Sequence, residues 1–161
     1  MNKLSYKIKI DERPNFYPNI FKIVIDGRDT DYFFDVAGLE ISRSESGVIP
    51  MFVCGCGYIM CTGYYVKIEI LDNEIIWSKF YYTSFDYENP EQNEEVDRVE
   101  LIKNFDGKRA DFIISPPLKF DKKEYNKMID DILKEVPQHK EQQAEFENSL
   151  EFYKSGDKFH M

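Results

Sequence analysis

The sequence has few of the side chains on which nucleophilic catalysis depends. It contains only two histidines, His139 and His160, and the second is the penultimate residue. It contains no G-x-S-x-G elbow, no P-loop and no G-x-G-x-x-G pattern, which are common signatures of hydrolases and nucleotide-binding proteins. Carboxylates are plentiful, but nothing in the sequence sets two of them at the separation that glycoside hydrolysis requires. We therefore expect a binding protein rather than an enzyme.

Long apolar runs and an excess of basic residues are also missing. No apolar stretch approaches the length that spans a bilayer, and Lys7 and Lys9 interrupt the N-terminal stretch where a secretory signal would lie. With 30 acidic and 21 basic side chains, the formal net charge is -9. Nucleic acids and anionic membranes attract proteins with a positive face. We therefore expect neither of them as a partner, whereas a basic protein partner fits the charge.

Cysteine is confined to one short stretch, F-V-C-G-C-G-Y-I-M-C-T-G-Y-Y, which holds Cys54, Cys56 and Cys61. An odd number of clustered cysteines differs from the spread, even set of a disulfide framework. A reducing cytoplasm is therefore the expected compartment.

Apolar and aromatic residues are abundant enough for a folded core, at 42% and 16% of the 161 residues. A chain of this length fits a single domain over residues 1–161. Its first part has the period-two alternation of strands. Turn sequences at residues 26–27, 72–73 and 106–107 predict three hairpins. Residues 35–47 fit a short helix, a strand and a loop, and we expect mostly connection there.

The C-terminal third has helical periodicity instead. Asp121, followed by Glu124 three positions later, predicts a helix start, and apolar residues from Tyr125 to Val136 form one stripe. Pro137 separates this helix from a more polar one over residues 138–154. We therefore predict an α+β fold in which an antiparallel sheet or open barrel, over residues 1–115, is covered on one side by two helices. Within the single domain, we therefore expect a β-rich part over residues 1–117, which includes the end of the last strand, and a helical part over residues 121–155.

The register expected for the cysteine hairpin brings the three sulfurs together. If residues 48–56 pair with residues 61–69, Cys56 lies opposite Cys61 and Cys54 lies opposite Gly63. Side chains alternate across a sheet, so all three thiols would share one face. The other face would then carry an apolar ladder, in which Val53 pairs with Tyr64, Met51 with Val66 and Ile49 with Ile68.

Three explanations fit such a cluster. The cysteines are small apolar residues that pack beneath a second layer, or they bind zinc together with a fourth ligand, or Cys56 and Cys61 form a reversible disulfide. The spacing C-x-C-x4-C is not among the common zinc spacings. Cys54, Cys56 and Cys61 therefore remain candidate metal ligands, with zinc as the candidate cofactor and no cofactor as the main expectation.

The same stretch resembles a set of small uncharacterised bacterial proteins. In these proteins a C-x-C-G-x3-C-G-type turn precedes a hairpin whose second strand carries a tryptophan. The matching residues lie within residues 48–80, and Thr62 replaces the expected second glycine of the turn. The matching residues are Cys54, Cys56, Gly57, Cys61, Gly63 and Trp77. The resemblance implies a related fold and a bacterial origin, and it implies no particular activity.

An acidic stretch follows the predicted strand that ends near Tyr82. Residues 86–100 hold seven carboxylates and a single basic residue, Arg98. Aromatic side chains just before them are the kind that anchor protein interfaces, although a solvated loop explains the same pattern. Bacterial immunity proteins use comparable acidic patches to block basic nucleases, which makes an immunity- or antitoxin-like inhibitor the leading hypothesis. A small metal-binding or thiol-regulated domain is the alternative. The candidate partner-binding residues are Tyr82, Phe85, Tyr87, Glu91, Glu94, Glu95 and Asp97.

Overall fold

The computed structural model describes residues 1–10, 18–54, 63–82, 85–101 and 112–155. Seven strands form one antiparallel sheet in the order β1-β2-β3-β4-β5-β6-β9. These strands are β1 (Leu4–Ile8), β2 (Phe21–Ile25), β3 (Arg28–Phe34), β4 (Gly47–Val53), β5 (Gly63–Ile70), β6 (Glu74–Tyr81) and β9 (Leu118–Asp121). At one end of the sheet Asn2 bridges to Phe120, so the two edge strands meet there and the sheet curls on itself. The predicted α+β class is confirmed.

Two of the three predicted hairpin turns lie among the described residues. Asp26 and Gly27 join β2 to β3 with positive φ angles of 51° and 76°, the backbone twist that suits a two-residue hairpin. The turn at residues 72–73 joins β5 to β6, where Ile68 lies directly opposite Trp77. The third turn, at residues 106–107, lies outside the described residues. Its flanking strands, β7 (Val99–Glu100) and β8 (Ile113–Ile114), do pair with each other.

The predicted pairing of β4 with β5 is confirmed, but its register is wrong. Ile49 lies opposite Val66 rather than Ile68, and Val53 lies opposite Gly63 rather than Tyr64. The register shifts between residues 50 and 52, which is the effect of an extra residue in one strand. The alternation that predicted one apolar face is also absent, because residues 48–53 of β4 are all buried.

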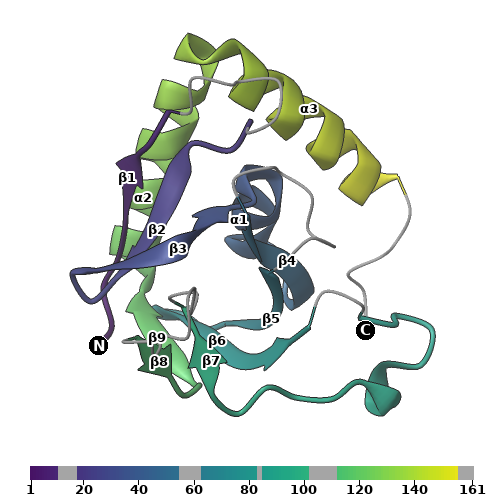
Figure 1. Ribbon diagram of the computed structural model, residues 1–161. Helices are drawn as coiled ribbons and strands as arrows, with labels where there is room; N and C mark the ends of the chain where they lie inside the picture. The colour runs from purple at the N-terminus through teal and green to yellow at the C-terminus, as the bar shows by residue number, and fades with distance from the viewer. Residues whose placement is uncertain (11–17, 55–62, 83–84, 102–111, 156–161) are drawn as a thin grey trace, which may run out of the picture.

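Three helices accompany the sheet: α1 (Val36–Ser42), α2 (Lys122–Glu135) and α3 (Lys140–Lys154). As predicted, a carboxylate oxygen of Asp121 accepts a hydrogen bond from the N–H of Glu124 at 3.0 Å and begins α2. The short 3-10 helix η2 (Val136–Gln138) separates α2 from α3 at Pro137. Figure 1 shows α2 beside the purple N-terminal strands and α3 across the top, with α1 between α3 and the sheet. Residues 35–47, expected mostly as connection, therefore include a buried helix.

The core is dense in aromatic rings. Trp77 is fully buried and contacts the rings of Phe52 and Phe120, at centroid distances of 5.5 and 4.8 Å. Its indole N–H donates a hydrogen bond of 3.3 Å to the hydroxyl of Tyr125 on α2, which also lies 2.6 Å from the Ser42 hydroxyl of α1. One buried polar network therefore joins the sheet to two helices.

Candidate partner-binding surface

The acidic segment, which we define as residues 85–97, is attached to the sheet near its end. Glu95 forms an antiparallel bridge with Tyr81, the last residue of β6. The N–H of Val96 donates a hydrogen bond of 2.8 Å to the carbonyl oxygen of Phe80. The Val96 side chain is only 6% exposed. The return of the segment to the sheet is therefore fixed by both backbone hydrogen bonding and burial.

Asp86 and Asn93 organise the interior of the segment. The Asp86 carboxylate accepts hydrogen bonds from the N–H of Glu88 at 2.9 Å and from the side-chain amide of Asn89 at 3.1 Å. These hydrogen bonds, that of Asn89 foremost, lower the pKa of Asp86. The Asn93 side chain accepts from the N–H of Asp86 at 2.8 Å and donates to its carbonyl oxygen at 3.0 Å. The short helix η1 (Pro90–Gln92) completes the turn between them.

Aromatic rings attach the first residues of the acidic segment to the sheet. Phe85 is buried, with its ring centroid 4.8 Å from those of Tyr81 and Tyr87. The hydroxyl of Tyr87 donates a hydrogen bond of 2.7 Å to the carbonyl oxygen of Val48 on β4. Burial raises the pKa of Tyr87. Three aromatic side chains were expected to contact a partner. Two of them, Phe85 and Tyr87, instead pack against the sheet and attach the segment to it.

Tyr82 differs, because its side chain is 55% exposed. It lines a cavity of about 260 Å³ between the end of β6 and the acidic segment. The cavity walls combine aromatic rings, side-chain amides and one carboxylate. The lining residues among those described are Tyr81, Tyr82, Phe85, Gln92, Asn93 and Glu94.

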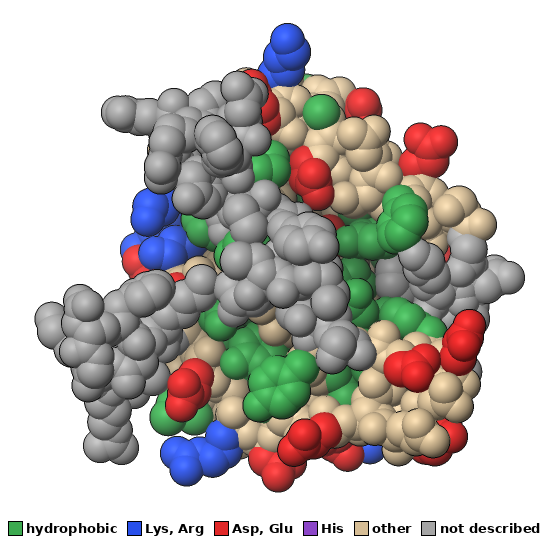
Figure 2. All heavy atoms as spheres, turned by 45° about the vertical axis from the view of Figure 1, so that its right-hand side comes forward, with side chains coloured by type: hydrophobic (Ala, Val, Ile, Leu, Met, Phe, Trp, Pro, Cys, Tyr) green, Lys and Arg blue, Asp and Glu red, His purple; other side chains and the backbone are tan. Residues whose placement is uncertain are grey.

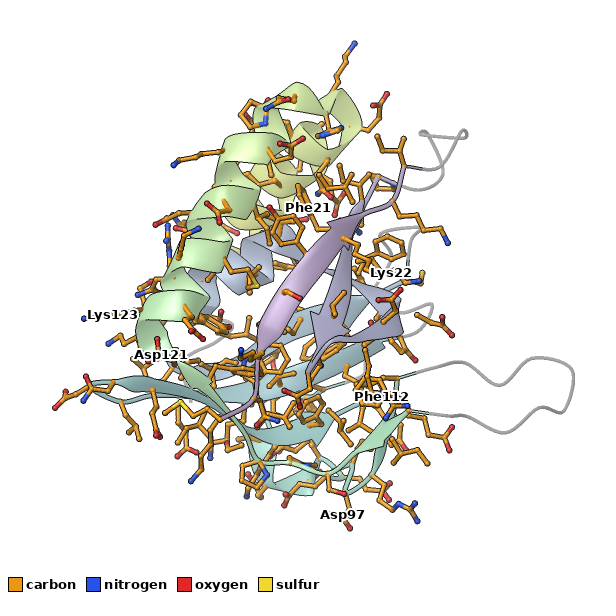
Figure 3. The ribbon with its side chains drawn as sticks, turned by 90° about the vertical axis from the view of Figure 1, so that its left-hand side faces the viewer. Phe21, Lys22, Asp97, Phe112, Asp121 and Lys123 are labelled. Atoms are coloured by element: carbon orange, nitrogen blue, oxygen red, sulfur yellow. The ribbon has the colours of Figure 1, made fainter. Side chains whose placement is uncertain are left out.

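The predicted acidic side chains lie on the surface. Glu91, Glu94, Glu95 and Asp97 are all exposed, and Glu95 forms an ion pair of 3.5 Å with Lys79. Figure 2 shows acidic side chains along the lower part of one face, beside hydrophobic side chains and with few basic ones among them. Figure 3 shows Asp97 at the lower end of the molecule, away from the helices. The structure therefore brings the carboxylates and Tyr82 to the same end of the fold.

The cysteine cluster is described only in part, since Cys56 and Cys61 lie outside the described residues. Cys54 directly follows β4, is 7% exposed and is disulfide-bonded. A sulfur in a disulfide offers no thiolate to a metal. Among the described residues no group of three histidine, cysteine, aspartate or glutamate side chains is placed to hold a metal ion. In this oxidised state Cys54 is therefore not available as a zinc ligand.

Sequence reasoning missed Asp35, which begins the buried helix α1. One carboxylate oxygen accepts a hydrogen bond of 3.0 Å from the N–H of Gly38, and the hydroxyl of Tyr153 on α3 donates to the other. The side chain is only 8% exposed. An aspartate directly before the apolar run V-A-G-L-E-I was a usable signal for a helix cap. Nothing in the sequence indicated its partner, which is 118 positions away.

Comparison with protein-family models, curated proteins and solved structures finds no match for this chain. The resemblance to bacterial proteins with a cysteine-rich turn therefore stays a prediction. Among the described residues no helix is long and apolar enough to cross a membrane.

Proposed function

We propose that the protein is a non-enzymatic bacterial binding protein of the cytoplasm, which inhibits a basic protein partner as immunity proteins and antitoxins do. The acidic segment and Tyr82 would form the contact surface. The partner would carry a positive patch that faces Glu91, Glu94, Glu95 and Asp97.

The observation that supports this proposal is the internal order of the acidic segment. Hydrogen bonds made by the side chains of Asp86 and Asn93, the buried ring of Phe85 and the half-buried ring of Tyr87 fix its conformation. A surface that is ordered before association loses little conformational entropy when it binds. Concentrated negative charge also speeds the encounter with a positive partner. A loop that was only a solvated connection would need neither these hydrogen bonds nor the packing of its aromatic rings.

The test compares two variants that each lack four negative charges. The segment variant carries Glu91→Gln, Glu94→Gln, Glu95→Gln and Asp97→Asn. The control variant carries Glu69→Gln, Asp72→Asn, Glu147→Gln and Glu151→Gln, at exposed positions outside the segment. Association with a fluorescein-labelled arginine-rich peptide is followed by stopped-flow fluorescence at low and physiological ionic strength.

We expect the segment variant to associate about tenfold more slowly than the wild type at low ionic strength, and the control variant to change little. The difference should shrink at physiological ionic strength, since exposed charges are then screened beyond about 8 Å. Equal slowing in both variants would show that net charge alone governs association and would overturn the proposal.

A small thiol-regulated domain is the second candidate function, and the disulfide of Cys54 favours it. Reduction of that disulfide would release the thiolate that a zinc site needs. A disulfide that persists would be unusual in the proposed cytoplasmic setting, because thiols are normally kept reduced there.

A further inference from the structure

The cavity beside the acidic segment has the size of a site for a single side chain. Its volume of about 260 Å³ falls below the range of about 300–1,000 Å³ that is typical of cofactor and drug-sized ligand sites. It opens at the same end of the molecule as the acidic side chains. A protruding side chain of a docked protein is therefore a better occupant than a whole cofactor.

The polar groups of the cavity wall differ in how many hydrogen bonds and ion pairs they already make. The Asn93 amide is fully engaged, because it accepts from the N–H of Asp86 and donates to the carbonyl oxygens of Asp86, Asn89 and Pro90. Glu94, in contrast, makes no hydrogen bond or ion pair with any residue that the structure describes. Its neighbour Glu95 is paired with Lys79 at 3.5 Å. Glu94 is therefore the carboxylate of the wall that is free to bind an incoming cation.

Tyr82 lines the same cavity as Glu94 and supplies an aromatic ring. Its ring lies 6.2 Å from the ring of Tyr64, at an interplanar angle of 33°, so the sheet supports it. More than half of the side chain remains exposed. A supported and exposed tyrosine ring attracts a cation placed over its face. A guanidinium group suits this arrangement better than an ammonium group, because it is planar, stacks on rings and pairs with carboxylates through two parallel hydrogen bonds.

We propose that this cavity binds an arginine side chain of the partner, whose guanidinium group stacks on the ring of Tyr82 and pairs with the carboxylate of Glu94. This inference rests on the proposed function and adds a specific contact to it. The surrounding acidic residues steer the partner, whereas the cavity determines which of its basic side chains is held. Glu91, which does not line the cavity, takes part in steering alone.

The test uses small probes in place of the unidentified partner. The protein, labelled with nitrogen-15, is titrated with N-acetyl-L-arginine amide, and the backbone amide shifts of Tyr82, Gln92 and Glu94 are followed by NMR. N-acetyl-L-citrulline amide is the control probe, because it has nearly the same shape and no charge. We expect saturable shifts with the arginine probe and binding of the citrulline probe that is weaker by about tenfold.

Matched variants assign the two contacts. Glu94→Gln should weaken arginine binding by about tenfold, whereas Glu91→Gln should leave it within about twofold, because only the first removes a charge from the cavity wall. Tyr82→Ala should abolish the shifts, and Tyr82→Phe should retain them, since the ring rather than the hydroxyl carries the interaction. Unchanged heteronuclear spectra outside the cavity would show that each variant is folded.

Two results would overturn the inference: no saturable shift at the three reporter residues, or equal binding of the arginine and citrulline probes. Either failure is separable from a failure of the proposed function. If the cavity binds no arginine but the segment variant still slows peptide association relative to the charge-matched control, the acidic docking surface stands and only the cavity assignment is lost.

Discussion

Asp35 has a carboxyl group that is almost fully buried at the start of α1. Burial raises the pKa of Asp35 to about 6, although the hydrogen bonds from Tyr153 and Gly38 act in the opposite direction. Glu145 on α3 adds to the rise, because a second negative charge nearby disfavours ionisation. Burial raises the pKa of Tyr153, and the negative charge of Asp35 adds to that rise. The contact between α1 and α3 therefore includes a buried titratable carboxyl group.

The protonation of Asp35 predicts how stability depends on pH. A carboxyl group whose pKa is raised on folding binds its proton more tightly in the folded state. Its contribution is therefore complete below about pH 4 and is lost as pH rises through about 6. A rise from the reference value of 3.8 to about 6 corresponds to roughly 3 kcal/mol. We expect the free energy of unfolding of wild type, relative to Asp35→Asn, to fall by up to that amount between pH 4 and pH 7.

Urea denaturation at pH 4, 5, 6 and 7 measures this difference. Asparagine is as good a helix cap as aspartate, so Asp35→Asn keeps the acceptor for Gly38 and removes the titration, while its NH2 group replaces the oxygen that accepts from Tyr153. That replacement does not depend on pH, so only the loss of the titration changes the difference across the pH series. Asp121→Asn, at the cap of α2, controls for the loss of a capping carboxylate as such. A difference between wild type and Asp35→Asn that stays constant across this pH range would contradict the prediction.

At the scale of elements, β4 shows where sequence reasoning reaches its limit. Its existence and its antiparallel pairing with β5 followed from its apolar residues and the hairpin pattern. The register did not, because Met51 and Phe52 both pack in the main core, and a strict alternation cannot place two consecutive residues on one face. The opposite face is also covered, by a small second core that contains Val48, Tyr81 and Phe85. A strand buried on both faces carries no polar positions that would reveal its register.

The packing of α1 against β4 gives a prediction for Gly38. A Cβ atom built at this position would lie 1.9 Å from the carbonyl oxygen of Pro50, which is backbone and cannot turn aside. Helix propensity alone would make Gly38→Ala stabilising by about 1 kcal/mol. We expect the reverse, a loss of about 3 kcal/mol in the free energy of unfolding, because the helix must move away from the strand.

Gly27→Asn is the matched control, because a Cβ atom at Gly27 meets nothing within 4 Å and asparagine tolerates a positive φ. We expect it to cost less than about 1 kcal/mol. Thermal or urea unfolding of both variants measures the difference between them. A Gly38→Ala protein as stable as the wild type would show that α1 does not contact β4 as closely as described.

For the whole molecule, the arrangement of sheet and helices was predictable, but the contacts that join them were not. The apolar stripe of α2 from Tyr125 to Val136 indicated which side faces the sheet. The polar helix α3 packs partly buried apolar side chains against the core, and it is also attached through Gln142, which is buried and accepts a hydrogen bond of 3.0 Å from the N–H of Ile20. No periodic pattern reveals that a glutamine in a polar helix is buried. Tyr82 is a comparable case. The sequence indicated it as a candidate partner-binding residue, but the cavity that it lines forms only when the chain folds.

The oxidation state of the chain as a whole tests the second candidate function. Because Cys54 is disulfide-bonded and the chain has three cysteines, the purified oxidised protein should take up one iodoacetamide group when denatured, and three after reduction. Intact mass spectrometry counts these groups. Cys54→Ala should take up two without reductant, because its former partner is released. Uptake of none by this variant would mean that Cys56 and Cys61 pair with each other, and uptake of three by the unreduced wild type would contradict thiol regulation through Cys54.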